Sequence, residues 1–399
     1  MVSAAQERLL QRTGPRAQAE TRGAPAVCVV SPRRDTYSET FVRAHIERLP
    51  TRVEVLYGSG YPFRTAGDAP LLPSPAAPLR LARGTLRRIA GWPWYRYEQR
   101  ALVRFLRAHH IGIVLAEFGP TGLGLMDACR EAAVPLVVHF HGFDAYQRDT
   151  LREVGARYTT MFRQAAAVIA VSREMVDQLQ RLGAPLSKVH CNPCGADLDL
   201  FQGADPGAAP AHFLAAGRFV DKKAPQLTLL AFERVLRRVP GARLTMIGDG
   251  PLWECCLRLA GAMGIADSVQ FPGAVSHEGV ADAMSHARAF VQHSVRTLQD
   301  EAEGTPIAVL EAGAMGLPVV ATRHAGIRDA VIDGVTGALV EEGDVAGMAA
   351  AMVRLAEDPE LARRWGRAAR ERVISEFSME RSIAHLWEIL VKAARSDAA

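Results

Sequence analysis

Two glutamates that flank a predicted helix start are the side chains best suited to chemistry. Glu303 is followed by Gly304, Thr305 and Pro306, and four residues separate Pro306 from Glu311. Glycine frees the backbone, threonine is a favoured N-cap and proline suits the first helical position, so we expect a helix to begin between the two acids. Its unpaired N–H groups and positive dipole end attract phosphate. The stretch therefore combines acceptors for hydroxyl groups with donors for phosphate.

Two cations follow a predicted buried strand in the second half of the chain. Residues 212–216 form this strand, Gly217 and Arg218 come next, and Lys223 lies a few residues further on. Ligands of open α/β sheets bind outside the carboxyl ends of the strands. There Arg218 can bind a diphosphate through two N–H groups and Lys223 can bind it as a point charge. Surface charge is the alternative, but an arginine directly after a buried strand and a glycine favours a phosphate site.

Polar residues also follow the first predicted strand, residues 26–31. Ser38, Glu39 and Thr40 come after the loop that leaves this strand, and Ser38 fits the N-cap of a helix over residues 39–49. At the carboxyl edge of a parallel sheet these residues would project into the ligand cleft. A plain helix cap is the competing interpretation.

A histidine and an aspartate follow another buried strand, residues 135–140. His141 lies just past the strand end and Asp144 follows in the same loop. A histidine at this edge is better placed for chemistry than one inside a core, so we expect His141 to be functional. His139 lies on the same face of the strand, and we expect it to be structural.

Length and composition place the chain among two-domain globular proteins. Its 399 residues exceed the usual size of one domain, and 49% of them are hydrophobic, which is enough for two cores. The net charge of +4 predicts neither a nucleic-acid-binding protein nor an acidic tail. Residues 1–25 lack the apolar centre of a signal peptide, and no apolar run reaches the roughly 18 residues of a membrane helix. We therefore expect a cytoplasmic protein.

The cysteines predict neither a disulfide scaffold nor a metal centre. There are six, scattered without regular spacing, which suits a reducing compartment. Cys191 and Cys194 form a CxxC pair beside His190, but no second Cys or His pair stands at zinc spacing, and the pair is predicted to lie in a loop. We expect structural thiols here and no metal.

The stretch from Glu303 to Glu311, followed by Gly316-Leu-Pro-Val-Val-Ala-Thr322, resembles the signature of the retaining glycosyltransferases of family four. The resemblance implies that Glu311 holds the ribose hydroxyls of a nucleotide sugar and that Glu303 faces the sugar. The backbone of Gly304, Thr305 and Pro306 would meet the diphosphate.

Other motifs in family order extend the resemblance over the first half of the chain. The string His141-Gly-Phe-Asp144 resembles a loop in which the imidazole contacts the donor sugar near the reacting carbon, and Ser38-Glu-Thr-Phe41 resembles the first-strand loop of a subgroup. Asn192 to Asp197 resembles the hinge segment, with two residues inserted before Gly195.

In the second half, Arg218 and Lys223 match the family's phosphate clamp, and Gly248 and Gly250 match the loop that receives the base and the phosphates. The resemblance implies that Arg218, Lys223, Glu303 and His141 are catalytic. It also implies transfer with retention, in which the leaving diphosphate helps to deprotonate the acceptor hydroxyl.

The implied fold is α/β of the GT-B type, with two Rossmann-like doubly wound parallel-sheet domains facing across a cleft. The expected divisions are a disordered tail, an acceptor domain, a linker, a nucleotide-sugar domain and a helix that returns to the first domain. Their bounds are 1–25, 26–201, 202–210, 211–376 and 377–399.

The segment Leu79–Arg107 is the most unevenly charged part of the chain. It interleaves arginines with large aromatic residues against the single acid Glu98. Amphipathic helices with a cationic face suit an anionic membrane surface, which predicts a peripheral position on the inner face of the plasma membrane. A solvated helix face and a nucleic-acid patch are the alternatives, but no nucleic-acid motif accompanies the segment, so we expect no such partner.

The function expected from these patterns is sugar transfer from a UDP- or GDP-sugar to a lipid-linked or growing bacterial polysaccharide, or to an oligosaccharide acceptor. The nucleotide sugar is a co-substrate, and no further cofactor is expected. Two other classes remain open. One is a nucleotide-sugar epimerase of the same fold, and the other is a non-catalytic scaffold at the membrane.

Overall fold

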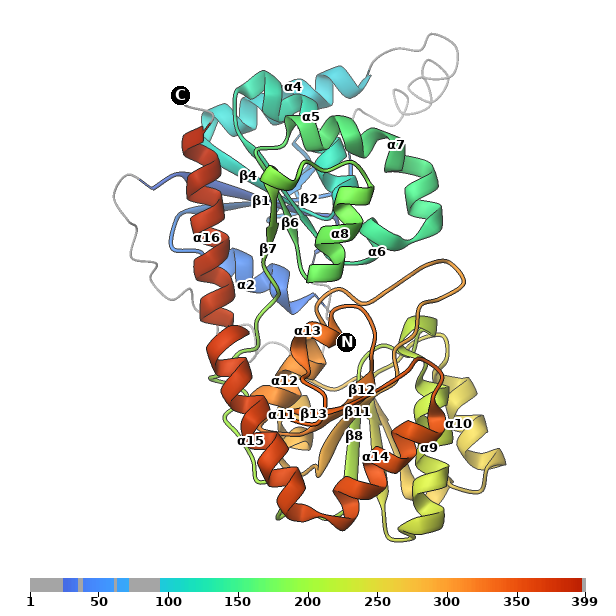
Figure 1. Cartoon of the computed structure of the whole chain (residues 1–399). Helices are drawn as coiled ribbons and strands as arrows, with labels where there is room; N and C mark the ends of the chain where they lie inside the picture. The colour runs from blue at the N-terminus through green and yellow to red at the C-terminus, as the bar shows by residue number, and fades with distance from the viewer. Residues whose placement is uncertain (1–23, 35–38, 61–62, 72–93, 397–399) are drawn as a thin grey trace.

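The computed structural model describes residues 24–34, 39–60, 63–71 and 94–396 of the 399-residue chain (Figure 1). Ser38, most of the predicted tail 1–25 and residues 79–93 of the basic segment lie outside these ranges. Figure 1 shows two α/β units, one above the other, and each is built around its own sheet.

The first unit contains a seven-stranded sheet in the order β3-β2-β1-β4-β5-β6-β7, in which only β3 runs antiparallel to its neighbour. The strands are β1 (Ala26–Ser31), β2 (Val53–Tyr57), β3 (Arg64–Thr65), β4 (Ile111–Glu117), β5 (Leu136–Phe140), β6 (Ala167–Ala170) and β7 (Val189–Cys191). The helices of this unit are α2 (Thr40–Arg48), α4 (Trp94–Ala108), α5 (Gly119–Ala132), α6 (Phe143–Tyr146), α7 (Arg148–Gln164) and α8 (Arg173–Arg181).

The second unit contains a six-stranded parallel sheet in the order β10-β9-β8-β11-β12-β13. The strands are β8 (His212–Ala216), β9 (Arg243–Ile247), β10 (Val269–Gly273), β11 (Ala289–Gln292), β12 (Val319–Thr322) and β13 (Gly337–Val340). The helices are α9 (Pro225–Arg238), α10 (Trp253–Ala262), α11 (His277–Ser285), α12 (Ile307–Met315), α13 (Ile327–Ala330), α14 (Val345–Glu357) and α15 (Pro359–Glu376). The prediction of two doubly wound parallel sheets is confirmed.

Burial explains why these segments form strands and why polar residues gather at one edge. The central strand β1 is buried from Val27 onward, as expected for a strand covered by helices on both faces. In each sheet the strand order reverses between two neighbours, β1 and β4 in the first sheet and β8 and β11 in the second. Such switch points open a crevice at the carboxyl ends of the strands. Residues from these edges form the candidate site.

Helix α16 (Met379–Ser396) leaves the second unit and packs on the first sheet, and Figure 1 shows it in red beside the upper unit. Its apolar residues, Leu386 and Leu390 among them, share one buried cluster with β1, β4 and β6. The amide side chain of Asn192 donates to the Ser382 carbonyl at 3.2 Å and lies 3.2 Å from a His385 ring nitrogen. The segment that leaves the first unit after β7 therefore lies beside α16, the helix that returns to it.

Helix α4 carries the described part of the basic segment. Leu102 and Leu106 are buried, whereas Arg100 and Arg104 are exposed on the opposite side. The helix is therefore amphipathic with a cationic outer face, and membrane binding by this segment stays a prediction. Among the described residues, the helices are too short or too polar to cross a bilayer.

Replacing Leu386 with alanine tests whether α16 stabilises the first unit. Leu386 is fully buried in the α16 cluster, so Leu386→Ala should lower the free energy of unfolding by about 2–5 kcal/mol. Glu388→Ala, an exposed change on the same helix, should change it by less than about 0.5 kcal/mol. Urea denaturation followed by circular dichroism measures both, and equal effects would contradict the packing described here.

Candidate active site

A buried carboxylate and two histidines lie at the switch point of the first sheet. Strand β4 ends at Glu117, which is fully buried, and its two oxygens lie 2.7 Å from Nδ1 of His45 and 2.6 Å from Nε2 of His141. His141 follows β5, and its ring stacks on Phe41 with centroids 4.2 Å apart. Helix α2 supplies both Phe41 and His45. Glu117 therefore fixes the orientation of the His141 ring.

The charges in this cluster depend on one another. Burial tends to raise the pKa of Glu117, but the charges and hydrogen bonds of His45 and His141 lower it below its ordinary value. Burial likewise tends to lower the pKa of His141, yet hydrogen bonds with Cys194 and Glu117 raise it to about 10. Burial and the charge of His141 keep the pKa of His139 well below its ordinary value. At neutral pH Glu117 is therefore a carboxylate and His141 an imidazolium.

Asp144 holds the loop that carries His141. Its carboxylate accepts hydrogen bonds from the backbone N–H groups of Gly119, His141 and Gly142 at 2.8–3.1 Å, and its side chain is fully buried. Burial raises its pKa. Asp144 is a possible cleft residue from the sequence, and a ligand role for it stays a prediction; in the structure the backbone amides occupy its oxygens. Its role is to fix the turn after β5.

Glu303 and Lys223 form an ion pair at the edge of the second sheet. Their charged atoms are 3.3 Å apart, and Nζ of Lys223 also donates to Oε1 of Gln292 at 3.2 Å. Burial alone raises the pKa of Glu303, but the charges of Lys223 and Lys222 bring it down to about 2. Burial lowers the pKa of Lys223, which the charge of Glu303 partly offsets. Glu303 is therefore ionised at neutral pH.

Arg218 lies beside this pair with its side chain exposed. Arg218, Lys223 and Gln292 line one cavity next to β8 and β11. Gly248 and Gly250 follow β9 at positive φ values of 129° and 143°, and a Cβ on either would overlap the backbone of Gly217 or Phe219. The two glycines thus let the loop after β9 lie directly against the loop that presents Arg218.

The loops after β5 and β11 meet across the space between the units. Gly304 packs so closely on the carbonyl oxygen of His141 that a Cβ at position 304 would overlap it. A Cβ on Gly142 would lie 3.5 Å from the Ala302 carbonyl oxygen. The φ of Gly304 is not among the positive values, so its backbone conformation does not require glycine. Position 304 requires glycine because only a residue without a Cβ allows this close approach. The contact brings His141 and Glu303 to the same region.

The predicted helix start between the two acids is confirmed, but its cap differs. Pro306 is the N-cap of α12, and Thr305 does not cap it. The Thr305 hydroxyl instead donates to the Val171 carbonyl at 2.8 Å and accepts from the Cys194 N–H at 3.1 Å. The prediction of Thr305 as the cap is wrong because two partners from the first unit engage its hydroxyl.

Glu311 lies within α12, where its side chain is buried and contacts α11. Its Oε1 is 2.6 Å from Nε2 of His277, and this hydrogen bond raises the pKa of His277 against the opposing effect of burial. Glu311 therefore already holds one hydrogen-bond donor near the second sheet. Its described hydrogen bond is to His277, whereas Glu303 pairs with Lys223.

The predicted residues near the first strand are placed only in part. Glu39 occupies the N-cap position of α2 without a side-chain cap bond, and Thr40 begins the helix. Ser38 lies outside the described residues, so its predicted role stays a prediction. Phe41, next in the chain, contacts His141.

Both halves of the sequence match families of one enzyme class. Residues 204–372 match the family Glycosyl transferases group 1, and residues 38–200 match Glycosyltransferase Family 4. AmsK of Erwinia amylovora, an amylovoran biosynthesis glycosyltransferase, is 32% identical over 289 residues, which span 71% of this chain and 70% of AmsK. The chain belongs to glycosyltransferase family 4.

A further relative bears a glycosyltransferase name, and two solved structures share the fold. WcaL of Escherichia coli K12, which bears the name of a colanic acid biosynthesis glycosyltransferase, is 28% identical over 288 residues, 70% of each chain. Anabaena HepE, solved in complex with UDP and glucose, matches 92% of this chain and 100% of its own with a TM-score of 0.71 at 16% identity. The sucrose-phosphate synthase of Thermosynechococcus elongatus matches 93% of this chain and 100% of its own with a TM-score of 0.71 at 20% identity. The GT-B fold is confirmed.

The sequence analysis did not single out Glu117, His45 and Gln292, which bond to one another or to predicted site residues. Phe41, by contrast, belongs to the string Ser38-Glu-Thr-Phe41 that resembles the first-strand loop, and its ring contacts His141. One signal was available, since Glu117 ends a buried strand beside the switch point and is paired in register with His139. Gln292 ends β11 in the same way and contacts Lys223.

The cluster around Glu117 also has the composition of a metal site. His45, Glu117 and His139 place one potential ligand atom each within 4.8 Å of one another, and all three are buried. The oxygens of Glu117 are, however, hydrogen-bonded to His45 and His141. These contacts explain the cluster as a charge-balanced hydrogen-bonded group, and the absence of a metal stays a prediction.

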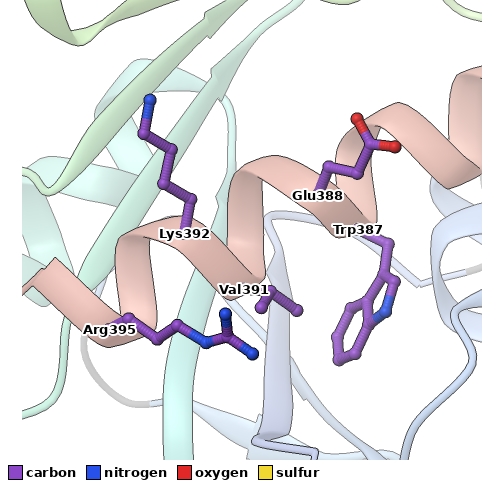
Figure 2. A pocket seen from close by; sticks show the side chains of 5 residues that line it. All are labelled: Trp387, Glu388, Val391, Lys392 and Arg395. Carbon is purple, nitrogen blue, oxygen red and sulfur yellow. The ribbon is translucent and has the colours of Figure 1, made fainter.

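A hollow along α16 lies apart from the site of this glycosyltransferase. Figure 2 shows its lining, with Glu388 and Lys392 on one side of the helix and Trp387, Val391 and Arg395 on the other. All five residues come from one helix, and none contacts the His141 or Glu303 groups in the bonds described above. We assign no chemistry to it.

Replacing Glu117 with glutamine tests its control of His141. Glu117→Gln keeps the shape but removes the charge that favours the imidazolium, so burial of His141 is less opposed. The pKa of about 10 should then fall, so His141 should lose its proton at a lower pH than in the unaltered protein. Imidazole NMR titration, with the signal assigned through His141→Asn, measures the change. An unaltered titration would show that Glu117 does not set the charge of His141.

Proposed function

We propose that this glycosyltransferase moves a sugar from a UDP- or GDP-sugar to a hydroxyl of a bacterial polysaccharide or its lipid-linked precursor, with retention of configuration. The observation that carries the proposal is the meeting of the two edges, where Gly304 contacts His141 while Glu303 pairs with Lys223. The names of AmsK and WcaL, which refer to amylovoran and colanic acid, support a polysaccharide acceptor.

The donor diphosphate fits the cations of the second unit. Arg218 is exposed and lines a cavity with Lys223, so both can meet phosphate oxygens, and the first N–H groups of α12 add a positive dipole end. We expect Glu311 to accept from the ribose hydroxyls as well as from His277, which already contacts its Oε1. The structurally similar HepE was solved in complex with UDP, which supports a uridine donor.

The sugar fits between Glu303 and His141. Glu303 is ionised and held by Lys223, so it accepts hydrogen bonds from sugar hydroxyls, while the His141 imidazolium donates from the facing edge. The two carboxylates nearest His141 are unsuited to attack, because Glu117 and Asp144 are fully buried and already accept hydrogen bonds. This supports front-face substitution, in which the leaving diphosphate accepts the proton of the acceptor hydroxyl.

Stabilisation of the leaving diphosphate is then the largest contribution to catalysis. Fixed cations and amide dipoles that already point toward the developing charge need no rearrangement when the bond to the sugar breaks. An epimerase of the same fold would use a similar donor pocket, but it would change the nucleotide sugar without an acceptor. Product analysis by NMR distinguishes the two, and it also reports the anomeric configuration that retention predicts.

Glu303→Gln should reduce kcat about 10²–10³-fold, because it removes the charge that faces the sugar. The donor KM should change much less, since the phosphates bind elsewhere. Release of UDP from UDP-sugars and of GDP from GDP-sugars measures turnover. Glu254→Gln, an exposed change on α10, serves as the control. Unchanged turnover in Glu303→Gln would contradict the enzymatic role of this residue.

Arg218→Ala should weaken binding of the nucleoside diphosphate about tenfold through the loss of one charged contact. Isothermal titration with UDP and with GDP measures the effect and also identifies the base. Arg258→Ala on α10 replaces another exposed arginine, which lies outside the cavity, and should leave the affinity unchanged. Equal affinities of all three proteins would contradict the phosphate clamp.

A further inference from the structure

A groove of about 470 Å³ lies where the loop after β11 meets helices α6, α7 and α8. Its polar lining comprises Tyr146, Arg148, Arg152, Gln178, Arg296 and Asp300. This volume is within the range of roughly 300–1,000 Å³ typical of small-molecule sites. None of these residues belongs to the donor site described above.

The groove exists only because the two units meet. Arg148 forms an ion pair of 2.7 Å with Asp300, and its backbone N–H donates to the Gln299 carbonyl at 2.9 Å. Next to it, the Gln147 amide donates to the Glu301 carboxylate at 2.7 Å. One wall therefore comes from α6 and α7, and the facing wall comes from residues 296–301.

The lining is cationic. Three guanidinium groups face one carboxylate, that of Asp300. Arg148 uses Nε and Nη2 for Asp300, and Arg296 lies over the Tyr146 ring at 5.4 Å while it pairs with Glu174. Arg152 is the least engaged, with a 3.4 Å contact to Asp149 and a side chain that is 72% exposed. Its guanidinium is thus available to a ligand.

The chemistry of the groove suits a sugar that carries an anionic group. Guanidinium groups bind carboxylate and phosphate oxygens in a planar, two-point geometry. The amide of Gln178 donates to the Ala145 carbonyl at 2.8 Å, and its carbonyl oxygen can accept from a hydroxyl. Leu151 supplies an apolar wall for the faces of sugar rings.

The groove adjoins the proposed reaction centre along the chain on both sides. Tyr146 ends the short helix α6, which begins directly after the His141 loop. On the facing side, Asp300 and Glu301 precede Glu303 in the same loop. A glycan seated in the groove can therefore extend toward the space between His141 and Glu303.

We infer that this groove binds an oxyanion carried by a sugar of the acceptor glycan, either a uronate carboxylate or a sugar phosphate. The inference rests on the proposed function, because the acceptor is the glycan that must approach Glu303. It adds a specificity element, since neutral glycans of the same size would lack the contact with Arg152.

Arg152→Ala is the sharpest test, because Arg152 does not contact the second unit in the bonds described and its loss leaves the walls intact. Binding of methyl glucuronoside, glucose 6-phosphate and methyl glucoside to the full chain is measured by NMR titration. We expect one or both acidic sugars to bind more tightly than the glucoside. Their Kd should rise about tenfold in Arg152→Ala and less in Arg152→Lys.

Arg157→Ala is the matched control, because Arg157 is an exposed arginine of α7 outside the groove lining. Its Kd values should equal those of the unaltered protein. Equal binding of all three sugars, or equal losses in Arg152→Ala and Arg157→Ala, would overturn the inference. A parallel titration with UDP separates the two proposals. If UDP binds but the acidic sugars show no preference, the groove proposal is wrong and the donor site is supported. If the acidic sugars bind but UDP does not, the donor site is wrong and the anion-binding groove is supported.

Discussion

The close contact of Gly304 with the His141 carbonyl is the constraint on which the rest of the site depends. Backbone meets backbone here, and a single added methyl group would force the two loops apart. The Gly304 loop follows β11 at the switch point of the second sheet, and the His141 loop follows β5, the neighbour of the switch-point strand β4, so the contact joins the two crevices into one region. Because catalytic geometry tolerates only small displacements, a contact without side chains is a precise way to set the distance between two units.

Around this contact, buried charges are arranged in pairs. Glu117 is balanced by His141 and also contacts His45, and Glu303 is balanced by Lys223. An unpaired charge at such depth would change its protonation state, whereas a paired one stays ionised and keeps its orientation. The proposed donor site therefore has its charges in place before a ligand arrives. That condition is what makes electrostatic stabilisation effective in enzymes.

Further from the contact, the same loops form a second set of interactions between the units. Residues 299–301 hold on to Arg148 and Gln147, and the loop then continues to Glu303. The proposed acceptor groove is thus built from the segment that also carries the sugar-facing carboxylate. This arrangement links recognition of the acceptor to the position of Glu303.

The sequence by itself determined the order of strands and helices, because unbroken apolar runs such as residues 26–31 and polar residues at their ends depend only on local composition. It also predicted Glu303, Lys223 and His141 as site residues, and the fold brings these to one region. Only the tertiary structure decided what each side chain contacts. Thr305 bonds across the units instead of capping α12, and Glu117 reaches His45 from a strand distant in sequence. Such contacts depend on how separate elements pack, and the local spacing of residues carries no record of that packing.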